Sequence, residues 1–199
     1  MKQSTLELMV EYTTDILPHG DMVEKYGETT IDLLKMYFND KNSSTMRERV
    51  MCHMLGIESN DNKLGYDGND GAKEMKPKNH DTTNPKSKKL NGAGNYSDMT
   101  HKRHQKFIDD NAEIYIGGFV DGRIVYIIKV PYVSLEEHFS KQIFKNLPNG
   151  DELNKYLRSM TFSLTHYKNM DGVEVVYLTD NLISYSTYLT KDLYTFLNQ

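Results

Sequence analysis

Residues 63–78 read K-L-G-Y-D-G-N-D-G-A-K-E-M-K-P-K, a stretch that combines turn-forming residues with acidic and basic side chains. Its centre, Gly-Asn-Asp-Gly at 68–71, has the composition of a tight turn, because Gly and Asn adopt positive φ at low cost. A turn at this point predicts a β-hairpin in which Asp67 faces Ala72 across the two strands.

The predicted hairpin would gather charged side chains on one of its faces. Side chains alternate along a strand, so Ala72, Glu74 and Lys76 share a face. Directly paired residues also share a face, which adds Asp67 to this set. The pattern therefore predicts two carboxylates and one ammonium group close together.

Two carboxylates beside a lysine suit the hydrolysis of a phosphodiester. Carboxylate oxygens bind Mg²⁺, which keeps several waters and accepts phosphate oxygens as further ligands. The metal acidifies a bound water, and a neighbouring lysine can orient that water and stabilise negative charge. A charged surface hairpin that binds nothing is the simpler alternative.

The order D…E-x-K, formed by Asp67, Glu74 and Lys76, resembles the PD-(D/E)xK nuclease superfamily, which includes most type II restriction endonucleases. The chain departs from the family pattern at two points. Tyr66 stands where the family has proline, and the spacing between the two acids is short. If Asp70 is the first acid instead, the hairpin register changes.

The resemblance implies an α/β (α+β) fold, with a restriction-endonuclease-like mixed β-sheet flanked by helices. It implies Mg²⁺-dependent hydrolysis of double-stranded DNA that leaves 5′-phosphate ends, by a homodimer that cuts at specific sites. Asp67, Glu74 and the backbone carbonyl of Met75 would hold the metal, and Lys76 would position the attacking water.

The charge distribution favours DNA more than the net charge does. The net charge is −4, but residues 73–106 contain nine Lys or Arg against three acids. A basic block next to candidate catalytic carboxylates is typical of a track for the phosphate backbone. A solvated lysine-rich loop is the alternative. The side chains expected to contact DNA are Lys78, Lys86, Lys88, Lys89, Lys102, Arg103 and Lys106.

The 199-residue chain is expected to form a single nuclease domain, with a helical N-terminal region at 1–57 and a catalytic α/β core at 58–199. Thr45 and Glu48 have the spacing of a capping box that opens a helix. In many members of the resembled family an acid on this helix contributes to the metal site. Glu48 could play that part, but the capping role is the favoured interpretation.

The composition predicts a cytoplasmic protein. The single cysteine, Cys52, cannot form an internal disulfide bond, and the first ten residues lack the apolar core of a signal peptide. No apolar run reaches the length of a membrane-spanning helix.

The remaining segments are predicted from periodicity and turn signals. Residues 79–96 lack periodicity and predict a long, DNA-contacting loop. His101 and His104 lie one turn apart on a predicted helix, 100–110, capped by Ser97 or Asp98, but a zinc site there lacks further ligands. Further predicted elements are strands at 112–120 and 123–130 joined by Asp-Gly, helices at 134–145 and 151–157, a strand pair at 160–167 and 173–178, and a helix at 181–197.

Two other functions remain open from the sequence. One is an HNH-type (ββα-metal) nuclease with His80 as general base and Asn95 and His104 nearby. The other is a non-enzymatic protein that binds nucleic acid or regulates through its basic block alone.

Overall fold

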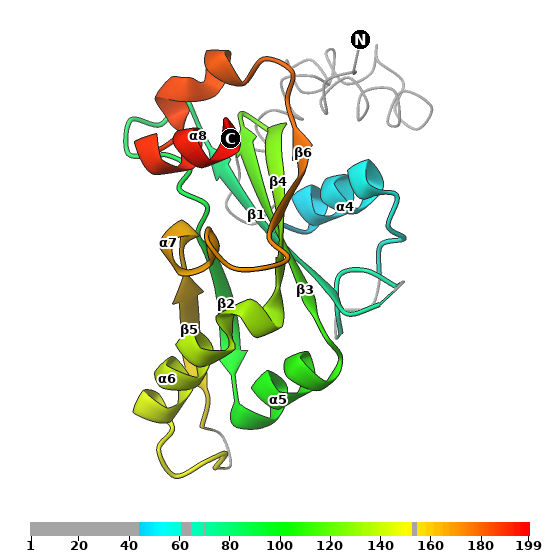
Figure 1. The fold of residues 1–199 in the computed structure, drawn as a ribbon, viewed down its shortest axis with the longest axis vertical. Helices are drawn as coiled ribbons and strands as arrows, with labels where there is room; N and C mark the ends of the chain where they lie inside the picture. Colours follow the sequence, from blue (N-terminus) through cyan, green and yellow to red (C-terminus); the bar gives the residue numbers. More distant parts are fainter. Residues whose placement is uncertain (1–43, 61–64, 70, 153–154) are drawn as a thin grey trace, which may run out of the picture.

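The protein, seen here as a computed structural model, is described for residues 44–60, 65–69, 71–152 and 155–199 (Figure 1). The elements in chain order are α4 (Ser44–Leu55), β1 (Lys73–His80), β2 (Gly94–Met99), α5 (His101–Asp109), β3 (Glu113–Val120), β4 (Arg123–Pro131), η1 (Tyr132–Leu135), α6 (Glu136–Asn146), β5 (Leu157–Phe162), α7 (Leu164–Tyr167), β6 (Glu174–Leu178), η2 (Leu182–Tyr188) and α8 (Lys191–Leu197).

A four-stranded mixed sheet in the order β1-β3-β4-β6 forms the centre of the molecule. β1 runs parallel to β3, and the other two pairings are antiparallel. The predicted β3–β4 hairpin is confirmed, and its turn residues Asp121 and Gly122 have φ of 47° and 75°. This is the positive-φ pair that a tight two-residue hairpin turn requires.

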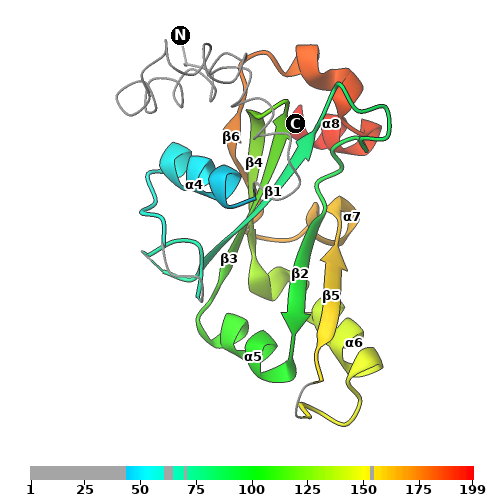
Figure 2. The same cartoon turned by 180° about the vertical axis from the view of Figure 1, so that it is seen from behind.

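Each face of the sheet buries its own apolar cluster. β3 contributes Ile114 and Ile116 to the larger cluster and Tyr115 and Phe119 to the smaller one, as strand alternation requires. α4 covers the smaller cluster, whereas α5, α6, α7 and α8 supply side chains to the larger one. Helices therefore flank the sheet on both faces (Figures 1 and 2), and the predicted mixed α/β architecture is confirmed.

Gly117 allows α4 to approach the sheet closely. A Cβ atom at this position of β3 would overlap the side chain of Met51, which is fully buried. The absent side chain thus sets the distance between α4 and the strands beneath it. The same distance positions Glu48, which also lies on α4.

A second, two-stranded sheet pairs β2 with β5 in antiparallel register (Figure 2). β2 begins inside the segment predicted to be loop, 79–96, which is therefore wrong at its end. β5 ends at Phe162, so the predicted strand at 160–167 is wrong in its second half. That half is the short helix α7, and β6 pairs with β4 instead. The predicted 173–178 strand exists, but its partner was wrong.

Helix boundaries show three further corrections. The helix at 100–110 is capped by Thr100, whose hydroxyl accepts from the Arg103 N–H at 3.1 Å, and not by Ser97 or Asp98. The predicted helix at 181–197 is split into η2 and α8. The helix predicted at 151–157 includes residues outside the described ranges, and Leu157 begins β5.

The N-terminal helical region can be compared with the structure only in α4, because 1–43 lie outside the described residues. α4 packs directly on the central sheet. No helix in the described part of the chain is long and apolar enough to cross a membrane.

Candidate active site

Glu74 and Lys76 lie on the same face of β1, as predicted. The Lys76 ammonium donates to Glu74 Oε1 at 2.5 Å. Glu74 is 6% exposed and the Lys76 side chain 16%, so the pair is largely withdrawn from water. A charged pair at this depth needs further polar partners to offset its desolvation.

Asp67 reaches the pair by a route different from the predicted hairpin. Residues 65–69 form a loop and do not pair with β1 as a strand. Two hydrogen bonds connect this loop to the start of β1: the Asp67 and Gly68 N–H groups donate to the Lys73 carbonyl at 3.0 and 3.1 Å. The regular partner of β1 is β3. The prediction that Asp67 directly faces Ala72 in a hairpin is therefore wrong.

The Asp67 side chain instead completes the free edge of β1. Its Oδ2 accepts from the Met75 N–H at 2.6 Å. The N–H and C=O of one strand residue point to the same side, so the Met75 carbonyl is directed to this edge too. Asp67 and the Met75 carbonyl, two of the groups predicted to bind the metal, thus meet beside Glu74. They do so although Asp67 and Glu74 are close in sequence. Asp70 lies outside the described residues.

Glu48 joins these groups from α4. The helix already begins at Ser44, so Thr45 does not occupy the capping position and the favoured capping role of Glu48 is wrong. Burial, followed by the charges of Asp67 and then Glu74, raises the pKa of Glu48 to about 7, while Lys76 opposes the shift. Glu48 therefore lies within electrostatic reach of all three motif residues.

The carboxylates crowd one another in a way that favours a cation. Burial and then the Glu74 charge raise the pKa of Asp67, with Lys76 acting in the opposite direction. Glu74 Oε2 is buried and has no hydrogen-bond partner among the described residues. A buried carboxylate oxygen without a partner is costly unless a positive group satisfies it.

A divalent hard cation fits this set of oxygens. The described residues contain no group of three or more His, Cys, Asp or Glu side chains arranged to hold a metal ion. Mg²⁺ is ordinarily bound by one or two carboxylates, with waters and phosphate oxygens as the other ligands. Asp67, Glu74 and the Met75 carbonyl would supply this small number of protein ligands.

Two tyrosines missed by the sequence reasoning support the site. Tyr66 packs edge-on against Phe107 of α5, with ring centroids 5.1 Å apart, and its hydroxyl donates to Asp110 at 2.9 Å. It thereby ties the Asp67 loop to α5. Tyr96 of β2 lies against Lys76. Local spacing carries no signal for either contact, because the partners are distant in sequence.

Basic side chains flank the carboxylates in two groups. Lys78 follows Lys76 on the same face of β1, and partial desolvation and then the charge of Lys88 lower the pKa of Lys78. On the other flank, Arg103 of α5 acts electrostatically on Asp67, and Lys106 lies 4.9 Å from the centroid of the Tyr66 ring. The remaining predicted DNA contacts, Lys86, Lys89 and Lys102, are exposed.

The loop that contains Lys88 is held in place by the rest of the fold. The His80 ring contacts the Lys88 carbonyl at 3.1 Å and lies 5.0 Å from the Tyr188 ring. At its start, the Thr82 N–H donates to Asp121 in the β3–β4 turn at 2.9 Å. The predicted long loop is therefore a structured arm beside the end of β1.

The residues of the HNH alternative lie in different places. Asn95 of β2 accepts from the Ser159 hydroxyl at 2.6 Å, and His80 contacts the arm just described. His104 is buried between α5 and α6, where its two ring nitrogens contact the Tyr132 hydroxyl at 2.8 Å and the Ser140 hydroxyl at 3.0 Å. Within the described part of the chain, each of the three residues thus contacts partners outside the set.

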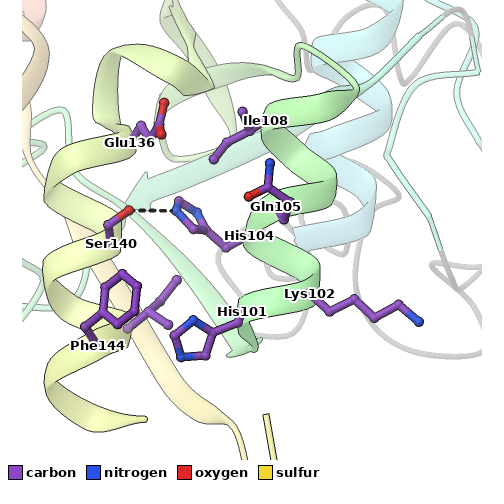
Figure 3. Close-up of a pocket in the computed structure, with 9 residues that line it drawn as sticks. His101, Lys102, His104, Gln105, Ile108, Glu136, Ser140 and Phe144 are labelled. Carbon is purple, nitrogen blue, oxygen red and sulfur yellow. Dashed lines mark hydrogen bonds between the residues drawn. The ribbon is translucent and has the colours of Figure 1, made fainter. Parts of the chain in front are cut away.

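A recess of about 360 Å³ separates α5 from α6 on the side of α5 that contains His104 (Figure 3). His101 and His104 project from α5 toward α6, and Lys102 is directed away. The His101 ring contacts the Leu147 carbonyl at 2.8 Å. Both histidines thus have structural partners, and neither belongs to the carboxylate cluster.

A comparison with protein families found no family model that matches the chain, and a comparison with curated proteins found no matching relative.

Proposed function

We propose that this protein is a Mg²⁺-dependent DNA endonuclease of the restriction-endonuclease-like type. The proposal depends on one observation above all: Asp67, Glu74 and Lys76 converge at the free edge of β1, where a buried Glu74 oxygen has no hydrogen-bond partner among the described residues. Lys76 is already in contact with the carboxylate that would bind the metal. The burial of these charged groups favours a functional site over a solvent-exposed charged strand.

Each residue of the cluster has a role that its position supports. Asp67, Glu74 and the Met75 carbonyl would hold Mg²⁺, and Glu48 lies within electrostatic reach of both carboxylates. A bound Mg²⁺ would supply positive charge against the phosphate and acidify water. The Lys76 ammonium orients the attacking water and stabilises charge on the phosphate oxygens. Attack at phosphorus breaks the bond to the 3′ oxygen, which leaves a 3′-hydroxyl and a 5′-phosphate.

The two basic flanks suggest how DNA would lie. Lys78 and Lys88 extend the line of Glu74 and Lys76 along β1, and Arg103 and Lys106 lie on the α5 side. A phosphate backbone that follows this line would pass over the carboxylates. Contacts of this kind position the DNA without reading its sequence.

Incubation of the purified protein with supercoiled plasmid, Mg²⁺ and a low salt concentration tests the proposal. We expect conversion to nicked or linear DNA, its loss in a chelator, and its loss in Glu74→Gln, which keeps the side-chain shape. His80→Ala is the matched control and should cut normally. Loss of activity in His80→Ala with survival in Glu74→Gln would favour the HNH alternative, and binding without cleavage in every condition would favour the non-enzymatic one.

Lys76→Ala separates chemistry from binding. We expect cleavage to fall by at least about a hundredfold, since removal of a single group that stabilises transition-state charge typically costs this much. Affinity for duplex DNA should change little, because the phosphate contacts lie on the flanks. Cleavage near the wild-type rate in Lys76→Ala would rule out the assigned role.

We further propose site-specific cutting by a homodimer, as in type II restriction enzymes. Discrete fragments from long duplex DNA, together with a dimeric mass in solution, are the expected results. A smear of fragments from a monomer would replace this proposal with a non-specific nuclease, while the assignment of the carboxylate cluster would stand.

A further inference from the structure

Tyr96 connects the candidate active site to the hydrophobic core. It lies on β2, is 1% exposed, and packs edge-on against Phe107 and Phe139 with ring centroids 5.2 and 5.8 Å apart. Aromatic contacts of this kind hold a ring in one orientation. The ring is therefore a fixed surface and not a mobile side chain.

One face of this fixed ring meets the Lys76 ammonium. Lys76 Nζ lies 4.5 Å from the centroid of the Tyr96 ring, well within the range of a cation–π contact. The same nitrogen donates to Glu74 Oε1 at 2.5 Å. The ammonium is thus held from two sides, by a carboxylate and by a ring.

The two partners of Lys76 differ in what else they must do. In the proposed nuclease, the Glu74 carboxylate accepts from Lys76 and would also bind the metal, so the two groups compete for its oxygens. The ring of Tyr96 attracts the ammonium without using any carboxylate oxygen. Because the attraction grows when water is excluded, a buried ring is well suited to this task.

We propose that Tyr96 is a positioning residue that keeps the Lys76 ammonium over the reacting phosphate while Glu74 is engaged elsewhere. The inference rests on the proposed nuclease function for its consequence, but not for the contact itself. Tyr96 does not touch the reacting atoms, and it acts only through Lys76.

The ring, and not the hydroxyl, carries this role. The Tyr96 hydroxyl is buried and has no hydrogen-bond partner among the described residues. Phenylalanine would keep the ring face and remove a polar atom that costs free energy when buried without a partner. Leucine would keep an apolar side chain and remove the ring.

Three variants test the role: Tyr96→Phe, Tyr96→Leu and the control Phe162→Leu. Phe162 is a fully buried ring 6.3 Å from Tyr96 and belongs to the same core cluster. The first measurement is the NMR shift of the Lys76 side-chain methylene carbons and protons in lysine-labelled protein, assigned by its absence in Lys76→Ala. The second is single-turnover cleavage with the DNA dissociation constant, below the unfolding temperature of every variant.

We expect the upfield ring-current shift of Lys76 to persist in Tyr96→Phe and Phe162→Leu and to disappear in Tyr96→Leu. Cleavage should stay within about threefold of wild type in Tyr96→Phe and fall at least about tenfold in Tyr96→Leu, with DNA affinity unchanged. In the Lys76→Ala background, Tyr96→Leu should cause no further loss of cleavage.

Each measurement can overturn a different part of the proposal. No ring-current shift in the wild type would refute the contact, whatever the activity. An equal loss of cleavage in Tyr96→Leu and Phe162→Leu would mean that Tyr96 only packs in the core and does not position Lys76. Absence of cleavage in the wild type, with the shift present, would refute the nuclease function and the catalytic consequence while leaving the Lys76–Tyr96 contact established.

Discussion

Glu48 occupies a position that is unfavourable for a carboxylate in the metal-free protein. Burial is the largest cause that raises its pKa to about 7, and Asp67 adds repulsion. The ordinary pKa of a glutamate is near 4.5. Between these two values the unfolded chain loses its proton and the folded protein keeps it, so the free energy of unfolding falls as pH rises.

Glu48→Gln should therefore stabilise the metal-free protein at alkaline pH. The variant and wild type should unfold alike near pH 4, where the carboxyl is protonated in both states. At pH 8 the variant should gain about 1–2 kcal/mol of unfolding free energy, a value reduced for solvent screening because the side chain is partly exposed. Urea denaturation in a chelator at the two pH values measures this difference.

Glu58→Gln, a change of an exposed acid just beyond α4, is the control for this experiment. It should not show the gain at pH 8. A Glu48→Gln variant that is equally stable or less stable than wild type at pH 8 would mean that Glu48 is not destabilised by its neighbours, and would remove it from the carboxylate cluster.

At the scale of single residues, sequence reasoning found the groups that carry charge and missed those that hold them. Glu74 and Lys76 share a face because strand alternation is a local rule, and it applies whatever the partner strand is. Tyr66 and Tyr96 act through Phe107 and Lys76, which lie far from them in sequence. Contacts of that range depend on the tertiary fold, which no local pattern encodes.

At the scale of elements, β1 shows why the predicted hairpin was wrong. Residues 65–69 form a loop and not a regular strand, so the Gly-rich turn signal at 68–71 does not join two regular strands. The long-range partner of β1 is β3, which pairs in parallel from Lys73 with Glu113 onward. A parallel partner needs a crossover, here through β2 and α5, and its identity cannot be read from neighbouring residues.

α4 provides the element-scale prediction, because its distance from the sheet is set by Gly117. Gly117→Ala places a methyl group against Met51, so α4 must shift or the Met51 side chain must change its rotamer. Overpacking of this kind typically costs about 1–3 kcal/mol of unfolding free energy. Cleavage should fall as well, because the shift moves Glu48 relative to Asp67.

A compensating variant separates this explanation from a general defect at β3. Met51→Ala leaves a cavity and destabilises alone, yet the combination Gly117→Ala/Met51→Ala should be less destabilised than the sum of the two single changes. A double-mutant cycle measured by urea denaturation gives this coupling. Strict additivity would mean that Gly117 and Met51 do not set the position of α4.

At the scale of the whole molecule, charge is distributed unevenly for a protein with a net charge of −4. The basic segment at 73–106 surrounds the candidate site, since it contains all of β1, the arm with Lys88, and the part of α5 up to Lys106. The excess of acidic residues that makes the net charge negative lies in the rest of the chain. Sequence reasoning could predict this segregation because it needs only counting, but it could not show that the two basic flanks lie on either side of the carboxylates.

The arrangement predicts which lysines control the salt dependence of DNA binding. Burial and then the Lys88 charge lower the pKa of Lys78, and this like-charge crowding is relieved when a phosphate lies between the two side chains. Each phosphate contact contributes roughly 0.9 to the slope of log affinity against log salt concentration. Lys78→Gln/Lys88→Gln should thus lower the magnitude of the slope by about 1–2.

The matched control removes two positive charges from α6, which supplies none of the basic residues that flank the carboxylates. Lys141→Gln/Lys145→Gln makes the same change in net charge as Lys78→Gln/Lys88→Gln, so it accounts for the general effect of charge on affinity. Fluorescence anisotropy with duplex DNA over a range of salt concentrations, in a chelator to prevent cleavage, measures both slopes. If the two double variants reduce the slope equally, the line of cations along β1 is not the path of the DNA backbone, and the DNA must approach the carboxylates from the α5 side, through Arg103 and Lys106.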